Sequence, residues 1–199
     1  MNENLWQRRQ LLLLGLGIVG AGAAVALPRL QQNAPPLTAP NSGKQIPDLA
    51  AAMPPAGETL PEFQGISAWL NSAPLTLSEL KGNVVLVQFW TFACINCQRT
   101  LPYVTRWHQQ YAAQGLKVIG VHTPEFAFER EESNIKNALR QHQITYPVPI
   151  DNDYKTWSAY KNNYWPHLYL ADRQGILQYD HIGEGAYDKT EQVIRQLLG

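Results

Sequence analysis

The sequence predicts an α/β fold in which helices pack on a mixed central sheet. Three observations support this fold class. A continuous apolar strand at 84–90 leads directly into an amphipathic helix and then into a second apolar strand at 116–122. Two further strands, at 165–171 and 176–182, are joined by a tight turn, and a last helix follows. A crossover helix makes the first two strands parallel, whereas a hairpin is antiparallel, so the sheet is expected to be mixed.

The N-terminal segment has the three parts of an export signal. Arg8-Arg9 forms a basic start, an uncharged run extends from Gln10 to Pro28, and Ala24-Val25-Ala26 resembles a cleavage site. This run is close to the lower limit of roughly 17–25 residues for a membrane-spanning helix. Residues 1–27 are therefore predicted to be an export signal or a membrane anchor, with anchoring through residues 5–27. The arginine pair before two leucines resembles the twin-arginine type of signal, although such pairs also precede ordinary apolar helices.

Residues 28–61 are predicted to form a linker. They hold eight of the fourteen prolines, and Ala, Gly, Ser, Thr and Asn fill much of the remainder. Such a composition cannot bury a core, so we expect either a semi-rigid tether to a membrane or a remnant behind a cleaved signal. The folded domain is predicted to span residues 62–199. The whole chain has 16 basic and 16 acidic side chains, which gives no electrostatic footprint for nucleic acid.

The central strand of the predicted sheet is the stretch 84–90. Its residues are apolar except Gln88, which is the pattern of a strand buried on both faces. The next helix is expected over 95–114, because apolar side chains at 101, 104, 107 and 111 share one helical face. Gly115 is expected to end this helix, and Pro102 to kink it.

The remaining elements alternate between helix and strand. They are expected as a helix at 129–143, a short strand at 147–150, a helix that runs to Tyr160, and a helix at 188–198. The first of these helices would turn Ile135, Ala138 and Leu139 inward. Asp151 and its two neighbours would cap the second helix, and residues 172–175 form the hairpin turn.

Cys94 and Cys97 are the only cysteines of the chain, and they lie where the helix after the central strand is predicted to begin. Unpaired amides and the helix dipole at that position favour a thiolate, which is the form that attacks disulfides. A structural zinc site needs four ligands, and no second cysteine pair completes one. A structural disulfide across so short a loop would contribute little chain entropy. Reversible dithiol–disulfide chemistry is therefore predicted, with no metal and no other cofactor.

Three stretches of the chain resemble a known family, in the same order. Residues 90–97, residues 120–129 and Tyr164-Trp165-Pro166 are similar to the TlpA/ResA-like branch of the thioredoxin-fold family, and within it to the DipZ group. The resemblance runs from about Phe63 to the C-terminus. It implies a three-layer sandwich with helices on both faces of the sheet. It also implies an extracytoplasmic thiol–disulfide oxidoreductase, in the periplasm or an equivalent lumen, that acts as a reductant.

The resemblance has consequences for the partners of the chain. The substrates would be exported proteins that contain disulfides or dithiols. In the DipZ group the domain is fused to membrane helices that pass electrons outward. This chain has room for at most one such helix, so a separate membrane electron donor is expected.

The cysteines and their neighbours have distinct expected roles. Cys94 is nearer the helix end and is expected to be the exposed attacking thiolate, and Cys97 is expected to resolve the mixed disulfide. The resemblance implies that Pro166 lies against the pair in the cis form, and that Trp165 presents its backbone to the substrate. Trp90 and Phe92 would shield the cysteines, although either side chain could simply belong to the core.

Gln88 departs from the family pattern. Many thioredoxins have a buried aspartate at this position, which accepts the proton of the resolving thiol, and glutamine cannot accept a proton. Glu125, in the loop after 116–122, is the predicted substitute if its carboxylate is buried near the cysteines and has a raised pKa. The alternative is that Glu125 is a surface glutamate or only caps the loop. His122 is a second candidate, or else an ordinary histidine at a strand end. Solvent is the third possible acceptor.

Two other functions remain open from the sequence. Peroxide-reducing enzymes share the fold, and they need a threonine or arginine that activates one cysteine, for which Thr91 gives weak support. The non-enzymatic alternative is a tethered module that binds its partners at Pro166 and has vestigial cysteines.

Overall fold

The computed structural model describes residues 57–199. The predicted signal or anchor at 1–27 and the predicted linker up to residue 56 lie outside the described residues. Among residues 57–199, no helix combines the length and the apolar character needed to cross a bilayer. The folded part begins a few residues before the predicted boundary at 62, because Leu60 is buried and its N–H donates to the carbonyl of Gly175 at 3.0 Å.

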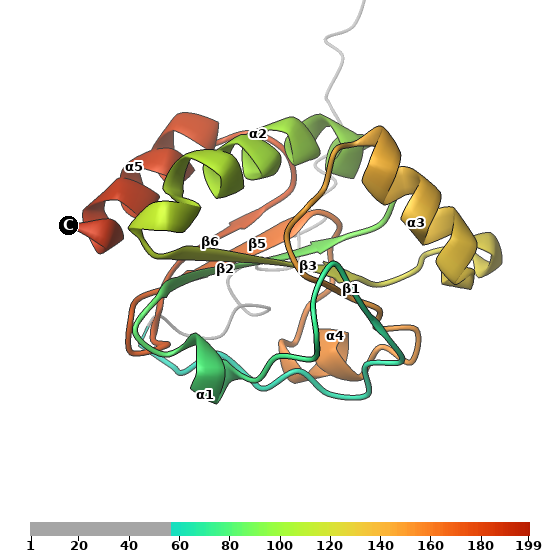
Figure 1. Cartoon of the computed structure of the whole chain (residues 1–199), viewed down its shortest axis with the longest axis horizontal. Helices are drawn as coiled ribbons and strands as arrows, with labels where there is room; N and C mark the ends of the chain where they lie inside the picture. Colours follow the sequence, from blue (N-terminus) through green and yellow to red (C-terminus); the bar gives the residue numbers. More distant parts are fainter. Residues whose placement is uncertain (1–56) are drawn as a thin grey trace, which may run out of the picture. The chain divides into compact units, whose positions relative to one another are not determined.

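The central sheet has four strands in the order β3-β2-β5-β6 (Figure 1). The strands are β2 (Val84–Trp90), β3 (Leu116–His122), β5 (His167–Ala171) and β6 (Leu177–Ile182). β2 is parallel to β3 and antiparallel to β5, and β5 is antiparallel to β6. The predicted mixed sheet is therefore confirmed. A second, two-stranded sheet pairs β1 (Trp69–Leu70) with β4 (Val148–Pro149).

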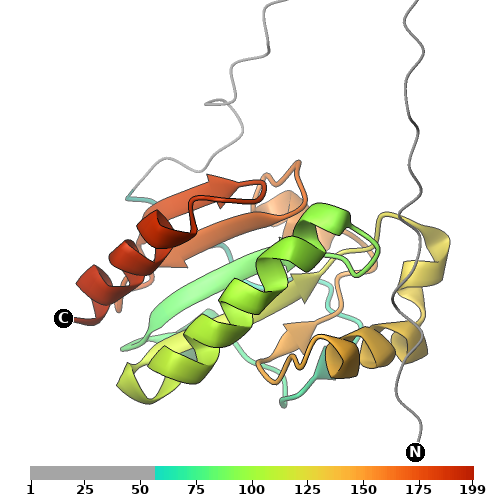
Figure 2. The same ribbon diagram turned by 90° about the horizontal axis from the view of Figure 1, so that it is seen from above.

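Helices cover both faces of the sheet, which confirms the predicted three-layer sandwich. One face carries α2 (Ile95–Tyr111) and α5 (Tyr187–Leu198), with α3 (Glu132–Gln141) beyond the β3 edge (Figure 2). The opposite face carries the short helices α1 (Leu77–Leu80) and α4 (Lys155–Ala159) (Figure 1).

β2 is buried along its whole length, as its apolar run predicts. Side chains alternate between the two faces of a strand. Leu86 and Trp90 belong to the core under α2, α3 and α5, whereas Val87 and Phe89 belong to the core under α1 and α4. Gln88 follows the same alternation, so its side chain is directed to the α2 side, into the same apolar core as Leu86 and Trp90.

Two helices differ in detail from their predicted bounds. The α-helix expected over 95–114 ends at Tyr111 and continues as a 3₁₀ turn, η2 (Ala112–Gln114), before Gly115 adopts a φ of 101°. The helix expected over 129–143 is two elements, the 3₁₀ turn η3 (Ala127–Arg130) and α3. The expected inner face of Ile135, Ala138 and Leu139 is confirmed.

The predicted cap at 151–153 is confirmed for Asp151. Its carboxylate accepts the backbone N–H groups of Thr156 at 3.1 Å and of Trp157 at 2.8 Å, and these belong to the first turn of α4. Carboxylates are favoured at this end of a helix. α4 is thereby fixed beneath the loop that precedes β5.

The topology brings three chain segments together at one end of the strands of the sheet. β2 and β3 are parallel, so their carboxyl ends meet there, and the antiparallel β5 begins there. The segments that follow Trp90, that follow His122 and that precede His167 are therefore neighbours. Ligand and catalytic sites of open α/β sheets lie at the carboxyl ends of the strands. The cysteine pair is in the first of these three segments.

Candidate active site

Cys94 and Cys97 are positioned by the start of α2. Cys94 is the N-cap residue, and its Sγ accepts the backbone N–H of Cys97 at 3.2 Å. Both cysteines are free thiols. Cys94 is half-buried and can be reached from outside, whereas the Cys97 side chain has no exposed surface. The predicted difference in access between the two thiols is confirmed.

The two thiols differ strongly in acidity. The hydrogen bond from the Cys97 side chain is the main cause that lowers the pKa of Cys94 to about 7, assisted by the backbone N–H groups of Cys97 and Asn96. Partial burial and the negative charge of Glu125 oppose this effect. Burial raises the pKa of Cys97, and so does its hydrogen bond with Cys94. With a pKa of about 7, Cys94 is about half ionised at pH 7, next to a protonated Cys97.

The loop before β5 forms a second wall of the site. The Trp165–Pro166 peptide bond is cis, as predicted. The Pro166 carbonyl accepts the backbone N–H of Gly183 at 2.8 Å, which ties the loop to the end of β6. The Trp165 indole donates to the carbonyl of Thr123 at 3.0 Å, and its ring lies 4.2 Å from the Trp157 ring. The loop is thus hydrogen-bonded both to the segment that follows β3 and to the end of β6.

Trp90 is buried in the core, which is one of the two positions expected for it, and its side chain offers no surface to a substrate. Its side chain has no exposed surface, and the indole N–H donates to the carbonyl of Gly120 at 3.1 Å. A Cβ atom at Gly120 would lie 3.1 Å from that indole nitrogen and 2.7 Å from the Tyr146 ring. Trp90 is a core residue that supports the loop from beneath, and it needs glycine at 120.

Phe92 is half-buried and does lie at the surface of the site. Its ring is stacked on the His122 ring at 5.7 Å and lies 5.8 Å from the Phe128 ring. The open side of Phe92 and the half-buried Trp165 are therefore the two predicted aromatic contacts that a substrate can reach.

Glu125 is not the buried carboxylate that the sequence predicts. Its side chain is exposed, and it acts on the site through its charge, which raises the pKa of Cys94. The buried carboxylate is that of Glu129, which the sequence reasoning missed. The capping-box pattern places Ser or Thr three residues before such a glutamate, whereas Phe126 holds that position here, so the sequence carries no clear signal for Glu129.

Glu129 joins the loop before the cysteines to the loop after β3. Its Oε1 accepts the N–H of Ala93 at 3.0 Å, and its Oε2 accepts the N–H groups of Glu125 at 2.6 Å and Phe126 at 2.8 Å. Burial tends to raise its pKa, but these bonds and the Thr91 hydroxyl outweigh burial, so the pKa of Glu129 is lowered. A carboxylate held in this way stays ionised and is a poor proton acceptor.

His122 and Gln88 complete the buried surroundings of the pair. Burial lowers the pKa of His122 to about 4, so its ring is neutral at pH 7, and its Nε2 lies 3.4 Å from the Thr91 hydroxyl. Both side-chain amide atoms of Gln88 are buried and have no partner among the described residues. Neither group is an effective base at neutral pH. Glu129, His122 and Gln88 are therefore all poor acceptors for the Cys97 proton.

Among the described residues, acidic side chains act on the cysteine pair more than basic side chains do. Arg99, which follows the pair, is exposed and forms an ion pair with Glu184 at 3.2 Å. Within residues 57–199, no three histidine, cysteine or acidic side chains lie together as metal ligands would. The charge of Glu125 raises the pKa of Cys94, and that of Glu129 raises the pKa of Cys97.

Comparisons with known proteins agree with this site. A sequence model of the AhpC/TSA family matches residues 56–180. The chain is 47% identical over 154 residues to Protein DipZ of Mycobacterium tuberculosis, a match that covers 76% of this chain and 22% of DipZ. It therefore spans about a fifth of that relative's length. It is 30% identical over 142 residues to the thiol-disulfide oxidoreductase YkuV of Bacillus subtilis, which covers 71% of this chain and 95% of YkuV.

Solved structures give the same result. A thioredoxin-like protein in its oxidized form superposes with a TM-score of 0.66 at 29% identity, over 71% of this chain and 95% of that protein. A second thioredoxin-like superfamily protein has a TM-score of 0.66 at 28% identity, over 71% of this chain and 96% of its own. The fold, the cysteine pair and these matches together place the chain in the AhpC/TSA family of thioredoxin-fold proteins, as a thiol–disulfide oxidoreductase.

Proposed function

We propose that this chain reduces disulfides of exported polypeptides outside the cytoplasm, with Cys94 as the nucleophile and Cys97 as the resolving thiol. The observation that carries the proposal is the unequal ionisation of the pair, with the pKa of Cys94 at about 7 and Cys97 buried and protonated. A thiol with a pKa near ambient pH is the most effective attacking group, since it combines a large thiolate fraction with high nucleophilicity.

The reaction is a two-step exchange. The Cys94 thiolate attacks one sulfur of the substrate disulfide, which breaks that bond and releases one substrate thiolate that takes up a proton. Cys97 then loses its proton to the leaving thiolate or to solvent and attacks Cys94 Sγ. This second step releases the other substrate sulfur and leaves the Cys94–Cys97 disulfide. Two electrons pass to the substrate, and a dithiol donor returns the pair to its reduced form.

The acidity of Cys94 supports reduction over oxidation. The pKa of the attacking thiol is about 7 in thioredoxin, a reductant, and about 3.5 in DsbA, a strong oxidant whose reduced form is stabilised. Here the Cys94 pKa is about 7. The charge of Glu125 raises the pKa of Cys94, and that of Glu129 raises the pKa of Cys97. Both carboxylates therefore disfavour a stabilised thiolate.

The substrate would contact Cys94, Pro166, Phe92 and Trp165. Pro166 and Trp165 would present backbone to the substrate chain, and the exposed side of Phe92 would pack against it. The surface supports an apolar polypeptide partner, because the exposed large hydrophobic residues of 57–199 all flank these segments. They are Ile95, Phe126, Phe128 and Tyr164. Apolar side chains that gather on a surface mark interaction sites.

The location and partners of the domain rest on the N-terminal sequence. The basic start and uncharged run of residues 1–27 would export the chain or anchor it, and residues 28–61 would separate the domain from the membrane. A membrane electron donor would return the cysteine pair to its reduced form.

The site gives less support to the two alternative functions. A peroxidase would need a threonine hydroxyl or an arginine at the attacking sulfur. The Thr91 hydroxyl contacts His122, and Arg99 is paired with Glu184. A binding module with vestigial cysteines would not require the pKa of Cys94 to be lowered.

Turnover and reduction potential test the proposal. With dithiothreitol as the donor, the chain should reduce insulin disulfides, and Cys94→Ser should abolish this activity. The reduction potential of the pair should be about −270 mV, the value of a reductant. A reduction potential of about −120 mV would indicate an oxidant and contradict the proposed direction of electron transfer. Alkylation of the reduced protein should label Cys94 with a midpoint near pH 7. Faster labelling of Cys97 would refute the assignment of the nucleophile.

Export is tested separately. A reporter that is active only outside the cytoplasm, fused after residue 61, should be active. A reporter that stays in the cytoplasm would contradict the location. Replacing Arg8-Arg9 by two lysines keeps the charge and tests the twin-arginine route.

A further inference from the structure

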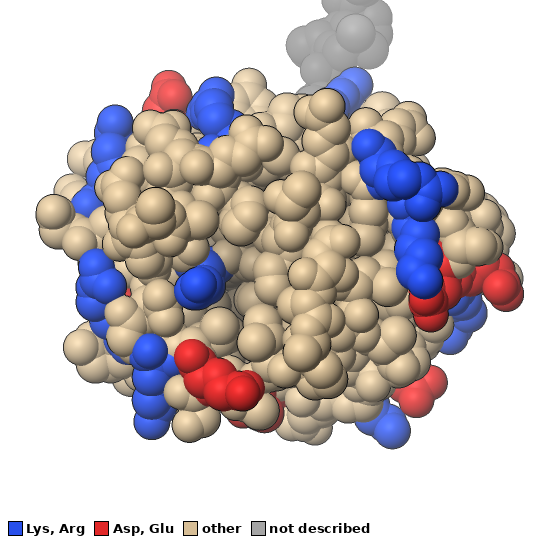
Figure 3. Space-filling view, in the orientation of Figure 1, with Lys and Arg blue, Asp and Glu red and all other residues tan. Residues whose placement is uncertain are grey.

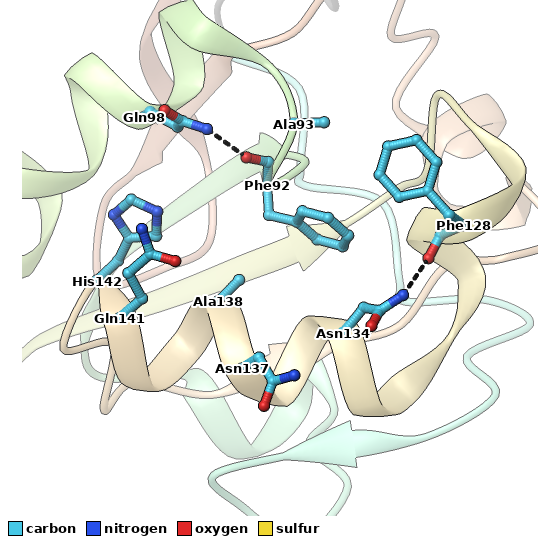
Figure 4. Close-up of a pocket in the computed structure, with 9 residues that line it drawn as sticks. All are labelled: Phe92, Ala93, Gln98, Phe128, Asn134, Asn137, Ala138, Gln141 and His142. Carbon is cyan, nitrogen blue, oxygen red and sulfur yellow. Dashed lines mark hydrogen bonds between the residues drawn. The ribbon is translucent and has the colours of Figure 1, made fainter.

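A groove of about 440 Å³ begins at the loop that carries the cysteines and runs to α3 (Figure 4). Its near end is formed by Phe92 and Ala93, directly before Cys94. Its other walls come from the first turn of α2, from η3 and from α3. The remaining lining residues are Gln98, Phe128, Asn134, Asn137, Ala138, Gln141 and His142. The groove lies on the β3 side of the cysteines, whereas the Pro166 loop lies on the β5 side.

The walls of the groove are rich in neutral amides. Gln98, Asn134, Asn137 and Gln141 line it, and none of its lining residues is a lysine, arginine, aspartate or glutamate. Burial lowers the pKa of His142, so its ring is neutral at pH 7. The lining residues themselves therefore carry no net charge, and the one cation bonded to them within residues 57–199 is Arg140, which donates to the side-chain oxygen of Asn137.

Some of these amides are fixed and others are free to bind. Gln98 donates to the carbonyl of Phe92 at 2.7 Å, and Asn134 donates to the carbonyl of Phe128 at 3.0 Å (Figure 4). Within residues 57–199, no hydrogen bond engages the Gln98 and Asn134 side-chain oxygens or the Gln141 amide. Each bond holds its side chain in place and leaves the oxygen as an acceptor.

The entrance of the groove is aromatic. The Phe92, Phe128 and Phe126 rings follow one another, with centroids 5.8 and 5.7 Å apart. Phe126 is 49% exposed and Phe128 is 51% exposed, which is unusual for phenylalanine. The charged side chains over α3 lie on its outer face, where basic and acidic groups are close together (Figure 3). One such pair is Lys136 with Glu132.

We propose that this groove binds the extended polypeptide segment that flanks the target cysteine, as a subsite beside Cys94. The proposal rests on the proposed function, because the occupant is the substrate chain itself. An extended chain presents one N–H and one carbonyl at each residue, and side-chain amides offer both a donor and an acceptor. The aromatic entrance takes apolar side chains, and the uncharged walls disfavour strongly charged segments.

The continuity of the groove with the cysteines identifies this occupant. A substrate joined to Cys94 by a disulfide has its cysteine Cα about 4.4–6.8 Å from the Cys94 Cα, and the groove begins at Ala93, the preceding residue. A chain that leaves the disulfide on the β3 side passes over Phe92 toward α3. The size of the groove is within the range of about 300–1,000 Å³ that is typical of ligand sites.

The test compares a polypeptide disulfide with one that has no polypeptide. Gln141→Trp places a large ring in the groove, and Lys136→Trp places the same ring on α3 outside it. We expect Gln141→Trp to raise the KM for insulin about tenfold, with unchanged turnover of bis(2-hydroxyethyl) disulfide. Lys136→Trp should change neither. Gln141→Glu keeps the shape and adds a charge, and it should weaken reduction of peptides with acidic flanks more than of those with basic flanks.

Binding is also measured without redox chemistry. A cysteine-free peptide of alternating apolar and amide residues should shift the amide resonances of Asn134, Ala138 and Gln141 in the reduced protein, and the Gln141→Trp protein should lose these shifts. Unchanged insulin KM in Gln141→Trp, or peptide shifts elsewhere only, would overturn the subsite and leave the proposed function intact. A wild-type protein that reduces neither disulfide would instead refute the proposed function, and the peptide shifts would still decide the subsite.

Discussion

Replacing Glu129 by glutamine should destabilise the reduced protein by about 2–4 kcal/mol. The carboxylate accepts three backbone N–H groups, one at Oε1 and two at Oε2. Glutamine has a single acceptor oxygen, so in either orientation of the amide at least one of these part-buried N–H groups faces an NH₂ group. Hydrogen bonds to charged groups contribute about 1.5–3 kcal/mol each, and an unsatisfied buried donor costs about 1–3 kcal/mol.

The measurement is thermal or urea unfolding of the reduced protein at pH 7. For a domain of this size, a loss of about 2–4 kcal/mol lowers Tm by roughly 5–15 °C. Glu125→Gln is the matched control, because that carboxylate is exposed and its removal should stay within about 0.5 kcal/mol of the wild type. A Glu129→Gln protein as stable as this control would refute the view that the carboxylate joins the two loops.

The pH dependence gives a second check of the same residue. The folded-state pKa of Glu129 is lowered below its usual value of 4.5. Its contribution to stability is therefore fully present above pH 4.5 and is lost as pH falls through the lowered folded-state pKa. The stability gap between wild type and Glu129→Gln should be constant at neutral pH and should narrow in that acidic range. A gap that persists unchanged in strong acid would contradict an ionised carboxylate.

Three further variants test other parts of the site. Glu125→Gln removes a charge that raises the pKa of Cys94, so the alkylation midpoint should fall below pH 7, and an unchanged midpoint would contradict the charge effect. Gln88→Met removes two buried, unpartnered polar atoms and should leave the unfolding free energy unchanged or raise it by up to about 2 kcal/mol; a clear loss would show that Gln88 has a partner. Trp165→Ala should raise the KM for insulin about tenfold without affecting bis(2-hydroxyethyl) disulfide, and equal effects on both would indicate a structural role.

The sequence predicts the sheet and its main helix well, because the signals there are local. The run 84–90 has no polar residue except Gln88, and α2 repeats its apolar side chains at helical spacing. The strand–helix–strand order then determines that β2 and β3 are parallel. These features follow from chain connectivity and periodicity, and the structure confirms them.

The parts of the site that the sequence predicts wrongly depend on contacts between loops. Several glutamates lie between the end of β3 and the start of α3, and only the path of the chain decides which is buried. The 3₁₀ turn η3 directs Glu129 inward and leaves Glu125 outside. For Trp90 the sequence leaves a contact with the cysteines and a core position both open. Strand alternation decides between them by placing the side chain in the core under α2.

The unequal burial of the two thiols also determines how the protein responds to oxidants. The Cys94 thiolate is the accessible one and would be oxidised first, to a sulfenic acid. The protected Cys97 thiol can condense with that sulfenic acid, which releases water and forms the same disulfide as turnover does. A dithiol donor then repairs the damage by the ordinary reaction. In a Cys97→Ser protein the sulfenic acid has no neighbouring thiol, and further oxidation to sulfinic and sulfonic acids would inactivate the chain irreversibly.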